Sequence, residues 1–272
     1  MRVMIYAISS RLLIVRYLDL VMFTRKTVSF LRSLKRNNHR EWFRAHKEDY
    51  ERHVRGPMIE VLARLTVDMP SFAPELIADP KVSLFRPYRD TRFSSDKSPI
   101  KTAVGARFPS RQFARGEGAG LYFEVAPRWV WIGGGMYRPS SADLNAIREE
   151  ITSSHPRLHR LVTSPTFKRV VGEMTGDRLT RVPRGYVKDH PAAHYLQFKQ
   201  FLGASEYEAS FATSPAFYRE LLRVFRAVTP LVKFLNQALL DRLTQGPILV
   251  DETTPRDRRR SASLPQAAAP MW

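Results

Sequence analysis

The chain has 272 residues, with 44 Lys and Arg against 26 Asp and Glu, and therefore a formal net charge of +18. An apolar content of 43% excludes a wholly disordered protein. The absence of cysteine excludes a disulfide scaffold, a cysteine-ligated zinc or iron–sulfur centre and a thiol nucleophile. The charge excess favours anionic partners, although an Arg-rich composition also follows from a GC-rich coding sequence.

The two ends of the chain differ from its middle. Residues 1–21 are mostly apolar, but Arg11, Arg16 and Asp19 leave no run long enough to span a bilayer. Because Met22 begins a plausible protein by itself, we interpret 1–21 as a start-site extension or a flexible segment. Residues 249–272 mix charge, Pro, Ser and Ala without a period, which predicts a disordered tail. Residues 22–248 are predicted to form a single globular domain in the cytoplasm.

The first third of that domain is predicted to be helical. Thr27 is expected to cap a helix that Asn37 and Asn38 end. A second helix is predicted over about 40–55, where Gly56 and Pro57 should break it. Pro57 is then expected to begin a third helix.

The middle of the chain changes to the pattern of strands. Short runs rich in Val, Phe, Tyr and Trp are bounded by Pro, Gly or Ser, and they predict strands over 81–86, 102–108, 120–125 and 129–132. The last two runs, joined by Ala126–Pro127–Arg128, predict a hairpin. No alternation of strands and helices occurs here. The predicted fold is therefore α+β, with a small antiparallel sheet of about four strands within 81–133, packed against N- and C-terminal helices.

Helical patterns return in the last third. Ser140 or Ser141 is expected to cap a helix ending near 151, and further helices are predicted over 154–162, 165–174 and 192–202. Ser214 and Pro215 form a capping signal for a long amphipathic stretch that continues to 244. Pro230 is expected to kink or divide it.

The densest charge excess lies in a short internal segment. Residues 83–111 contain seven Lys and Arg but only two Asp, a net +5. A loop of this kind could direct several cationic groups at one ligand, because guanidinium forks match carboxylates and phosphates. The ligand-binding candidates are Arg86, Arg89, Arg92, Lys97 and Lys101. Asp90 and Asp96 could orient the arginines, hold a divalent cation or act as a general base. Alternatively, Arg–Asp pairs with aromatic cover simply attach the loop to its domain.

Other candidates lie outside this segment. Asn38, Arg40 and Glu41 could line a polar pocket beside the charged loop, or cap a helix there. His190 is the best candidate for proton transfer, and Arg184 precedes it in a loop that includes Gly185 and Tyr186.

Two further patterns have competing interpretations. Three glycines at 133–135 suggest either an anion-binding nest or a bulged strand end. The pairs His155/His159 and His190/His194 have helical spacing but lack the HExxH form, so no metal site is predicted.

Several of these segments together resemble a known family. The motifs are FLRSLKRNNHREWF, EDYERHVRGPM, SLFRPYRDTRFSSDKSPIK, GGGMYRP and PRGYVKDHP, in that order, between 23 and about 202. They resemble the family called domain of unknown function 2461. One departure is Ile100, where the family pattern usually has Tyr. The resemblance implies a soluble domain, mainly bacterial and fungal, and implies no activity.

These observations predict a pocket for an anionic small ligand, phosphorylated ligands included, with His190 or Glu41 as acid or base if the protein is an enzyme. The alternative is a non-catalytic domain that binds nucleic acid or a protein partner, although no nucleic-acid-binding motif is evident. The only cofactor considered is a divalent cation at Asp90 and Asp96. An enzyme or a small-ligand site predicts that the side chains of Arg86, Arg89, Arg92, Asn38, Glu41 and His190 converge in one cleft. A nucleic-acid-binding domain predicts basic groups spread over a flat or convex face.

Overall fold

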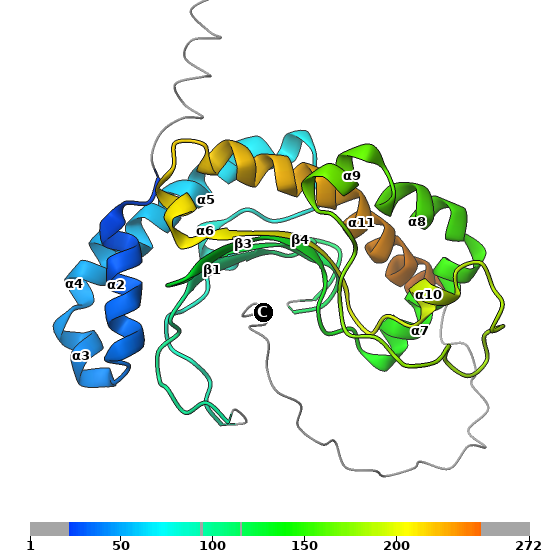
Figure 1. Ribbon diagram of the computed structural model, residues 1–272, viewed down its shortest axis with the longest axis horizontal. Coiled ribbons are helices and arrows are strands. Elements are labelled where there is room, and N and C mark those ends of the chain that lie inside the picture. Colours follow the sequence, from blue (N-terminus) through cyan, green and yellow to red (C-terminus); the bar gives the residue numbers. More distant parts are fainter. Residues whose placement is uncertain (1–21, 93–94, 115, 246–272) are drawn as a thin grey trace, which may run out of the picture.

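The computed structural model describes residues 22–92, 95–114 and 116–245; the segments 1–21 and 249–272 lie outside this part of the chain. It confirms an α+β fold with one four-stranded antiparallel sheet in the order β1-β2-β3-β4. The strands are β1 (Val104–Phe108), β2 (Gly120–Val125), β3 (Trp129–Met136) and β4 (Phe201–Glu208). Figure 1 shows that the sheet is strongly curved and that helices cover its convex face.

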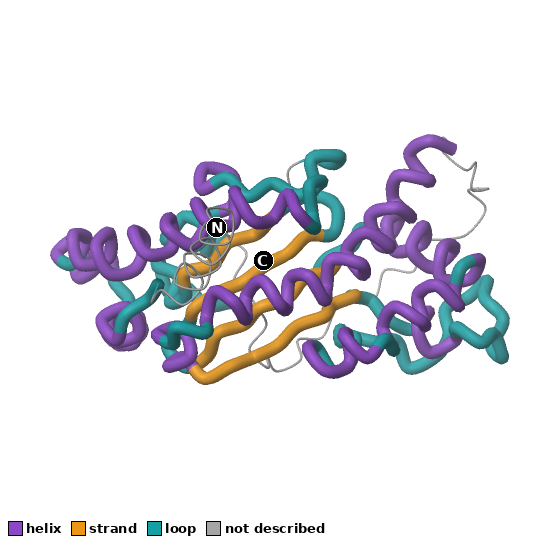
Figure 2. The backbone as a smooth tube through the Cα atoms, turned by 90° about the horizontal axis from the view of Figure 1, so that it is seen from above, coloured by secondary structure: helices purple, strands orange, loops and turns teal. Residues whose placement is uncertain are grey.

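The core lies between the convex face and the long helix α11 (Phe217–Gln245). Phe108 and Phe123 pack against Phe225 of this helix, with ring centroids 5.3 and 6.4 Å apart. Figure 2 shows α11 crossing above the strands. Because side chains alternate along a strand, Tyr122 and Glu124 lie on the opposite, concave face.

The predicted hairpin is confirmed, but β3 continues beyond Ile132 through the glycine run to Met136. These glycines lie inside the sheet, between β2 and β4, and not at a bulged strand end. A Cβ added at Gly133 would lie 2.3 Å from the Gly203 carbonyl oxygen, so only glycine lets the strands approach this closely. Gly135 adopts φ +127°, a left-handed conformation that other residues rarely adopt.

The predicted strand over 81–86 and the predicted helix over 192–202 are wrong. Residues 81–86 form no strand: α6 (Pro80–Ser83) is a short helix that Asp79 caps through a hydrogen bond from the Lys81 N–H, 2.8 Å. The predicted helix over 192–202 is only α10 (Ala193–Leu196), and the chain then enters β4. The sheet therefore has the predicted number of strands but extends from 104 to 208.

The N-terminal helices continue past the predicted break at Gly56 and Pro57, but the helix predicted over about 40–55 is divided at His46. Their bounds are α2 (Arg25–Arg36), α3 (Arg40–Ala45), α4 (Lys47–Tyr50), a π-helical turn (Glu51–Arg55), α5 (Gly56–Asp68) and a 3-10 turn (Met69–Ser71). Gly56 and Pro57 do not break this run. In a regular helix the His53 carbonyl accepts from the N–H of residue 57, but Pro57 has no N–H. The Thr27 hydroxyl donates to this carbonyl instead, at 2.6 Å. Thr27 is buried inside α2, and Thr24 is its N-cap.

The C-terminal helices follow the prediction closely. They are α7 (Ser141–Ser153), α8 (His155–Val162), α9 (Pro165–Val170), a 3-10 turn (Ala209–Thr213) and α11. Ser140 caps α7. Pro230 does not divide α11, which curves with the sheet in Figures 1 and 2. None of the helices in the described ranges is long and apolar enough to cross a membrane.

Candidate functional site

The charged segment leaves the sheet before β1 as a two-stranded ribbon. We use this name for residues 85–92 and 95–101, in which Tyr88 lies opposite Ile100. The Arg89 N–H donates to the Pro99 carbonyl (2.9 Å) and the Lys101 N–H to the Pro87 carbonyl (2.8 Å). Asn38 holds this ribbon against the N-terminal helices, because its side chain donates to the Ile100 carbonyl (2.8 Å) and accepts from the Ile100 N–H (3.0 Å). The carboxamide of Asn38 thus connects segments 62 residues apart.

Both aspartates of the ribbon are engaged by arginine. Asp90 accepts two hydrogen bonds from the Arg92 guanidinium, 3.1 and 2.8 Å, which lower the pKa of Asp90 to about 2. Hydrogen bonds from Ser98 lower the pKa of Asp96, and the nearby Arg89, which pairs with it, contributes. Lys97 is exposed, and its Nζ donates to the Thr91 carbonyl, 2.9 Å. Both pairs lie within the ribbon, so they order the loop itself, whereas its attachment to the domain comes from Asn38.

Lys101 and Arg86 differ from the other cations of the ribbon. The Lys101 ammonium lies 4.4 Å from the Phe85 ring centroid. Burial lowers the pKa of Lys101, and the charges of Arg86 and Arg89 lower it further, whereas Glu124 opposes them. Arg86 is exposed and makes no ion pair with any residue in the described ranges. Positive charge therefore gathers at the end of the ribbon next to β1, where Arg86, Arg89 and Lys101 lie; we call this end the base of the ribbon.

Beside Lys101, the concave face of the sheet carries an aromatic layer with a buried carboxylate. Glu124 is 2% exposed and accepts hydrogen bonds from the Tyr122 hydroxyl (2.7 Å) and the Trp129 indole (3.0 Å). Phe85 and Trp131 flank Tyr122 at ring distances of 5.9 and 5.7 Å. We call this the Glu124 cluster: Phe85, Tyr122, Glu124, Trp129 and Trp131.

Residues 40 and 41 lie at the start of α3. Arg40, Arg44 and Tyr88 line a cavity of about 300 Å³ between that helix and the ribbon. Glu41 is exposed, with its carboxylate 3.5 Å from His39 Nδ1. Arg40 thus lies beside the ribbon, as the sequence analysis expects.

His190 and Arg184 lie elsewhere, near α8 and α10, at the end of the molecule opposite to α2–α4 (Figures 1 and 2). Arg184 is exposed on the loop before α10. His190 Nδ1 accepts from the Ala192 N–H, 3.0 Å, and its ring centroid lies 5.8 Å from that of His155. The two histidine pairs therefore meet, but no group of three or more potential metal ligands is found in the described residues.

The candidates consequently do not converge in one cleft. Asn38, Arg40 and the ribbon residues share one end of the molecule, whereas His190 and Arg184 occupy the other. The Glu124 cluster was not predicted from the sequence. Its only signal was a lone acidic residue within the apolar run LYFEV, two positions from Tyr122 and therefore on the same face of the strand.

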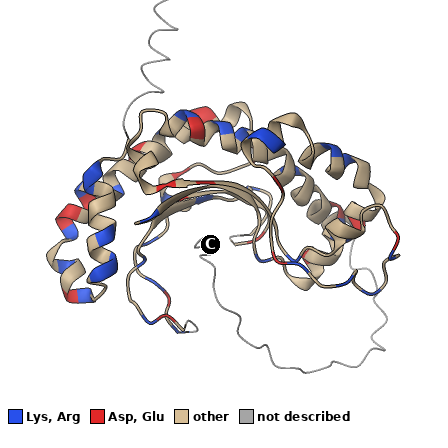
Figure 3. Ribbon diagram, in the orientation of Figure 1, with Lys and Arg blue, Asp and Glu red and all other residues tan. Residues whose placement is uncertain are grey.

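The remaining positive charge is dispersed. Figure 3 shows Lys and Arg along the outer helices at both ends of the molecule, interspersed with Asp and Glu, whereas the central strands carry few charges. Within the described residues, this distribution provides no single basic helix or stripe of the kind that reads a nucleic-acid groove.

The comparisons with known proteins give one match. The model of the conserved hypothetical protein family DUF2461 matches residues 26–234, most of the described chain. No curated protein and no solved structure matches.

Proposed function

We propose that this chain, which belongs to the DUF2461 family of conserved hypothetical proteins, binds an anionic small molecule at the base of the ribbon. The observation that supports this site is the excess of positive charge at Arg86, Arg89 and Lys101. Of these three, only Arg89 is paired with a carboxylate of the ribbon. Burial lowers the pKa of Lys101 most, and a bound anion would offset the further lowering by the charges of Arg86 and Arg89.

Phosphate and carboxylate are the groups that suit this site. The Arg86 guanidinium offers a planar fork of donors, and Lys101 offers a compact ammonium. The aromatic layer beside them provides surface for the uncharged part of a ligand, since Phe85 and Trp131 are both partly exposed. A phosphorylated small molecule is therefore the ligand class that we propose first.

The geometry supports binding in preference to catalysis. Asp90 and Asp96 are engaged by arginine, which removes them as free bases and as an open cation site. Glu41 and His190 do not face the base of the ribbon together. Their roles as acid or base stay predictions, as do the cytoplasmic location and the binding of Arg184 to ligand.

Binding of nucleic acid or a protein partner is the alternative, and the exposed Lys and Arg of the outer helices favour it. The two proposals differ in salt dependence and in the residues involved. Contacts to a phosphate backbone would involve many dispersed cations and would weaken steeply with salt. A small-molecule site would depend on Lys101 and Arg86 alone.

The test compares Lys101→Met with Lys97→Met. Methionine preserves the contact with Phe85 and removes the charge, whereas Lys97 is exposed and serves as a matched control. Inorganic phosphate, glucose 6-phosphate, adenosine monophosphate and a single-stranded oligonucleotide are titrated by calorimetry at low salt. We expect a phosphate-bearing small molecule to bind the wild type and K97M equally and K101M about tenfold more weakly.

Proton uptake gives a second readout. Because a bound anion raises the pKa of Lys101, binding at alkaline pH should be accompanied by more proton uptake in the wild type than in K101M. Equal binding by K101M and wild type, or binding of the oligonucleotide alone, would contradict the proposed function.

A further inference from the structure

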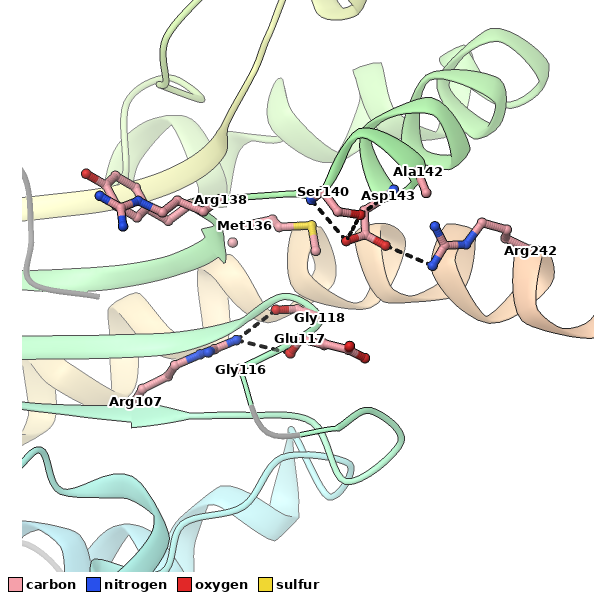
Figure 4. Close-up of a pocket in the computed structure, with 12 residues that line it drawn as sticks. Arg107, Gly116, Glu117, Gly118, Met136, Arg138, Ser140, Ala142, Asp143 and Arg242 are labelled. Carbon is pink, nitrogen blue, oxygen red and sulfur yellow. Dashed lines mark hydrogen bonds and ion pairs between the residues drawn. The ribbon is translucent and has the colours of Figure 1, made fainter. Parts of the chain in front are cut away.

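A second cavity lies at the other end of the strands, where β1 and β3 finish and α7 and α11 approach (Figure 4). Its volume is about 560 Å³. This volume lies within the range of small-molecule sites. The antiparallel register places it away from the ribbon, because Lys101 precedes β1 whereas Arg107 lies near the end of that strand.

Arginines from three separate segments line this cavity: Arg107, Arg138 and Arg242. Arg107 projects from the concave face of β1, and its Nη2 donates to the carbonyls of Glu117 (3.1 Å) and Gly118 (2.9 Å). Its Nε is buried and has no hydrogen-bond partner among the described residues. The described residues include no carboxylate that forms an ion pair with this guanidinium. Its partners are carbonyl oxygens, which carry only partial charges and do not neutralise it.

Arg138 follows the end of β3 and is exposed, with its guanidinium 5.3 Å from the Tyr137 ring centroid. It makes no ion pair with the parts of the chain that the structure describes. Arg242, on the last turns of α11, pairs with Asp143 Oδ1 at 2.9 Å. Figure 4 shows Arg138 and Arg242 on opposite sides of Met136, whose side chain provides an apolar wall between them.

The Asp143 carboxylate interacts with both Ser140 and Arg242. Asp143 Oδ2 accepts from the Ser140 N–H (3.1 Å) and hydroxyl (2.7 Å), which caps α7, while Oδ1 holds Arg242. The other acidic residue of the lining, Glu117, is exposed. Three arginines against two carboxylates leave a net charge of +1, and the guanidinium nearest to Asp143 is the one already paired.

We infer that this cavity binds a small organic anion, in which a carboxylate or phosphate contacts the Arg138 guanidinium, a compact apolar body lies against Met136, and the other two arginines of the lining add positive charge. Planar guanidinium groups match either anion with paired hydrogen bonds. The lining supplies a charged donor that is not used up by a carboxylate, the exposed Arg138 guanidinium. This inference does not rest on the proposed function, because the two sites share no residue.

The experiment uses the full-length protein with succinate and inorganic phosphate as probes, titrated by calorimetry. Arg138→Ala should weaken binding about tenfold, since it removes a charged donor from an exposed position without disturbing the core. Arg128→Ala is the matched control, because Arg128 is an equally exposed arginine at the opposite end of β3. It should bind both probes as the wild type does.

Asp143→Asn gives a result of the opposite sign. Asparagine can still accept a hydrogen bond from Ser140, but it releases Arg242 from its ion pair, so binding should become tighter. A melting temperature within a few degrees of the wild type shows that this variant is folded.

Two results would overturn the inference. One is equal affinity in R138A, R128A and the wild type; the other is equal weakening in R138A and R128A, which indicates only an effect of net charge. K101M separates the two sites: it should leave binding at this cavity unchanged, and a loss in K101M but not in R138A would place the anion at the ribbon.

Discussion

Replacing Asn38 by Ala should release the ribbon and destabilise the fold. The side chain of Asn38 makes two hydrogen bonds to the backbone of Ile100, a residue that is fully buried. The substitution leaves the N–H and the carbonyl of Ile100 without these partners, and each unpaired buried group costs about 1–3 kcal/mol. Since water can reach part of the exposed ribbon, we expect the free energy of unfolding to fall by about 2–4 kcal/mol.

Asn37 provides the control for this prediction. Its side chain also donates to a backbone carbonyl, that of Ser33 at 3.0 Å, but within the same helix end. Asn37→Ala should therefore cost less than about 1 kcal/mol. Urea unfolding gives the two free energies, and hydrogen exchange of the Arg89 and Lys101 amides reports on the ribbon itself. The reasoning fails if N38A is within about 0.5 kcal/mol of N37A, or if those amides keep their protection.

Further predictions concern the sheet and the titration of individual groups. Gly133→Ala should destabilise the protein by roughly 3 kcal/mol, because the added Cβ would lie 2.3 Å from the Gly203 carbonyl oxygen and 2.6 Å from the Ala204 Cβ. Thermal unfolding measures the loss of stability, and a near-neutral effect would show that the strands separate easily. The Asp90 carboxylate should titrate at about pH 2 by NMR, and its pKa should rise toward the ordinary value in Arg92→Ala, which removes the guanidinium but keeps the backbone N–H of residue 92. Because the folded pKa is lowered, any stability from this pair is present above about pH 4 and is lost as the pH falls through about 2. Burial raises the pKa of Tyr50 to about 12, so its neutral form contributes stability below about pH 10. This stability is lost as the pH rises through about 12. Absorbance at alkaline pH should show Tyr50 ionising after the exposed tyrosines, and early ionisation would refute its burial.

Local signals predicted the helices and the hairpin because the information lies within a few residues. The strands of the hairpin carry alternating core residues, and Ser140 precedes an amphipathic run in the manner of an N-cap. The short helix α6 could also have been found, since Asp79 followed by Pro80 is a capping signal, but the β-branched Val82 and the aromatic Phe85 favoured a strand.

The strand β4 could not be found in this way. Its sequence contains Gly203 and Ala204, and the residues before it include good helix formers. It is extended because β3 pairs with it along eight residues, with Gly203 opposite Gly134. This pairing joins segments about 70 residues apart, so tertiary contact and not local propensity decides the conformation.

The candidate sites were also predictable only where the signal is local. The ribbon was predicted from its charge density, but the pairing of Arg92 with Asp90 and of Arg89 with Asp96 was not. The arginines of the cavity come from β1, the end of β3 and α11, and no single segment contains two of them. A cluster assembled from distant segments has no signature in a window of sequence.

The two sites lie toward opposite ends of β1. Lys101 precedes this strand and lies against Phe85, whereas Arg107 is near its end and donates to the Glu117 and Gly118 carbonyls. Arg107 lies opposite Tyr122 in the register, and farther along the same row Gly133 and Ala204 bring β3 and β4 into close contact and add almost no side chain. Because each end adds arginines from a separate part of the chain, a change that weakens one site should leave the other intact, and the losses in a K101M/R138A double variant should add.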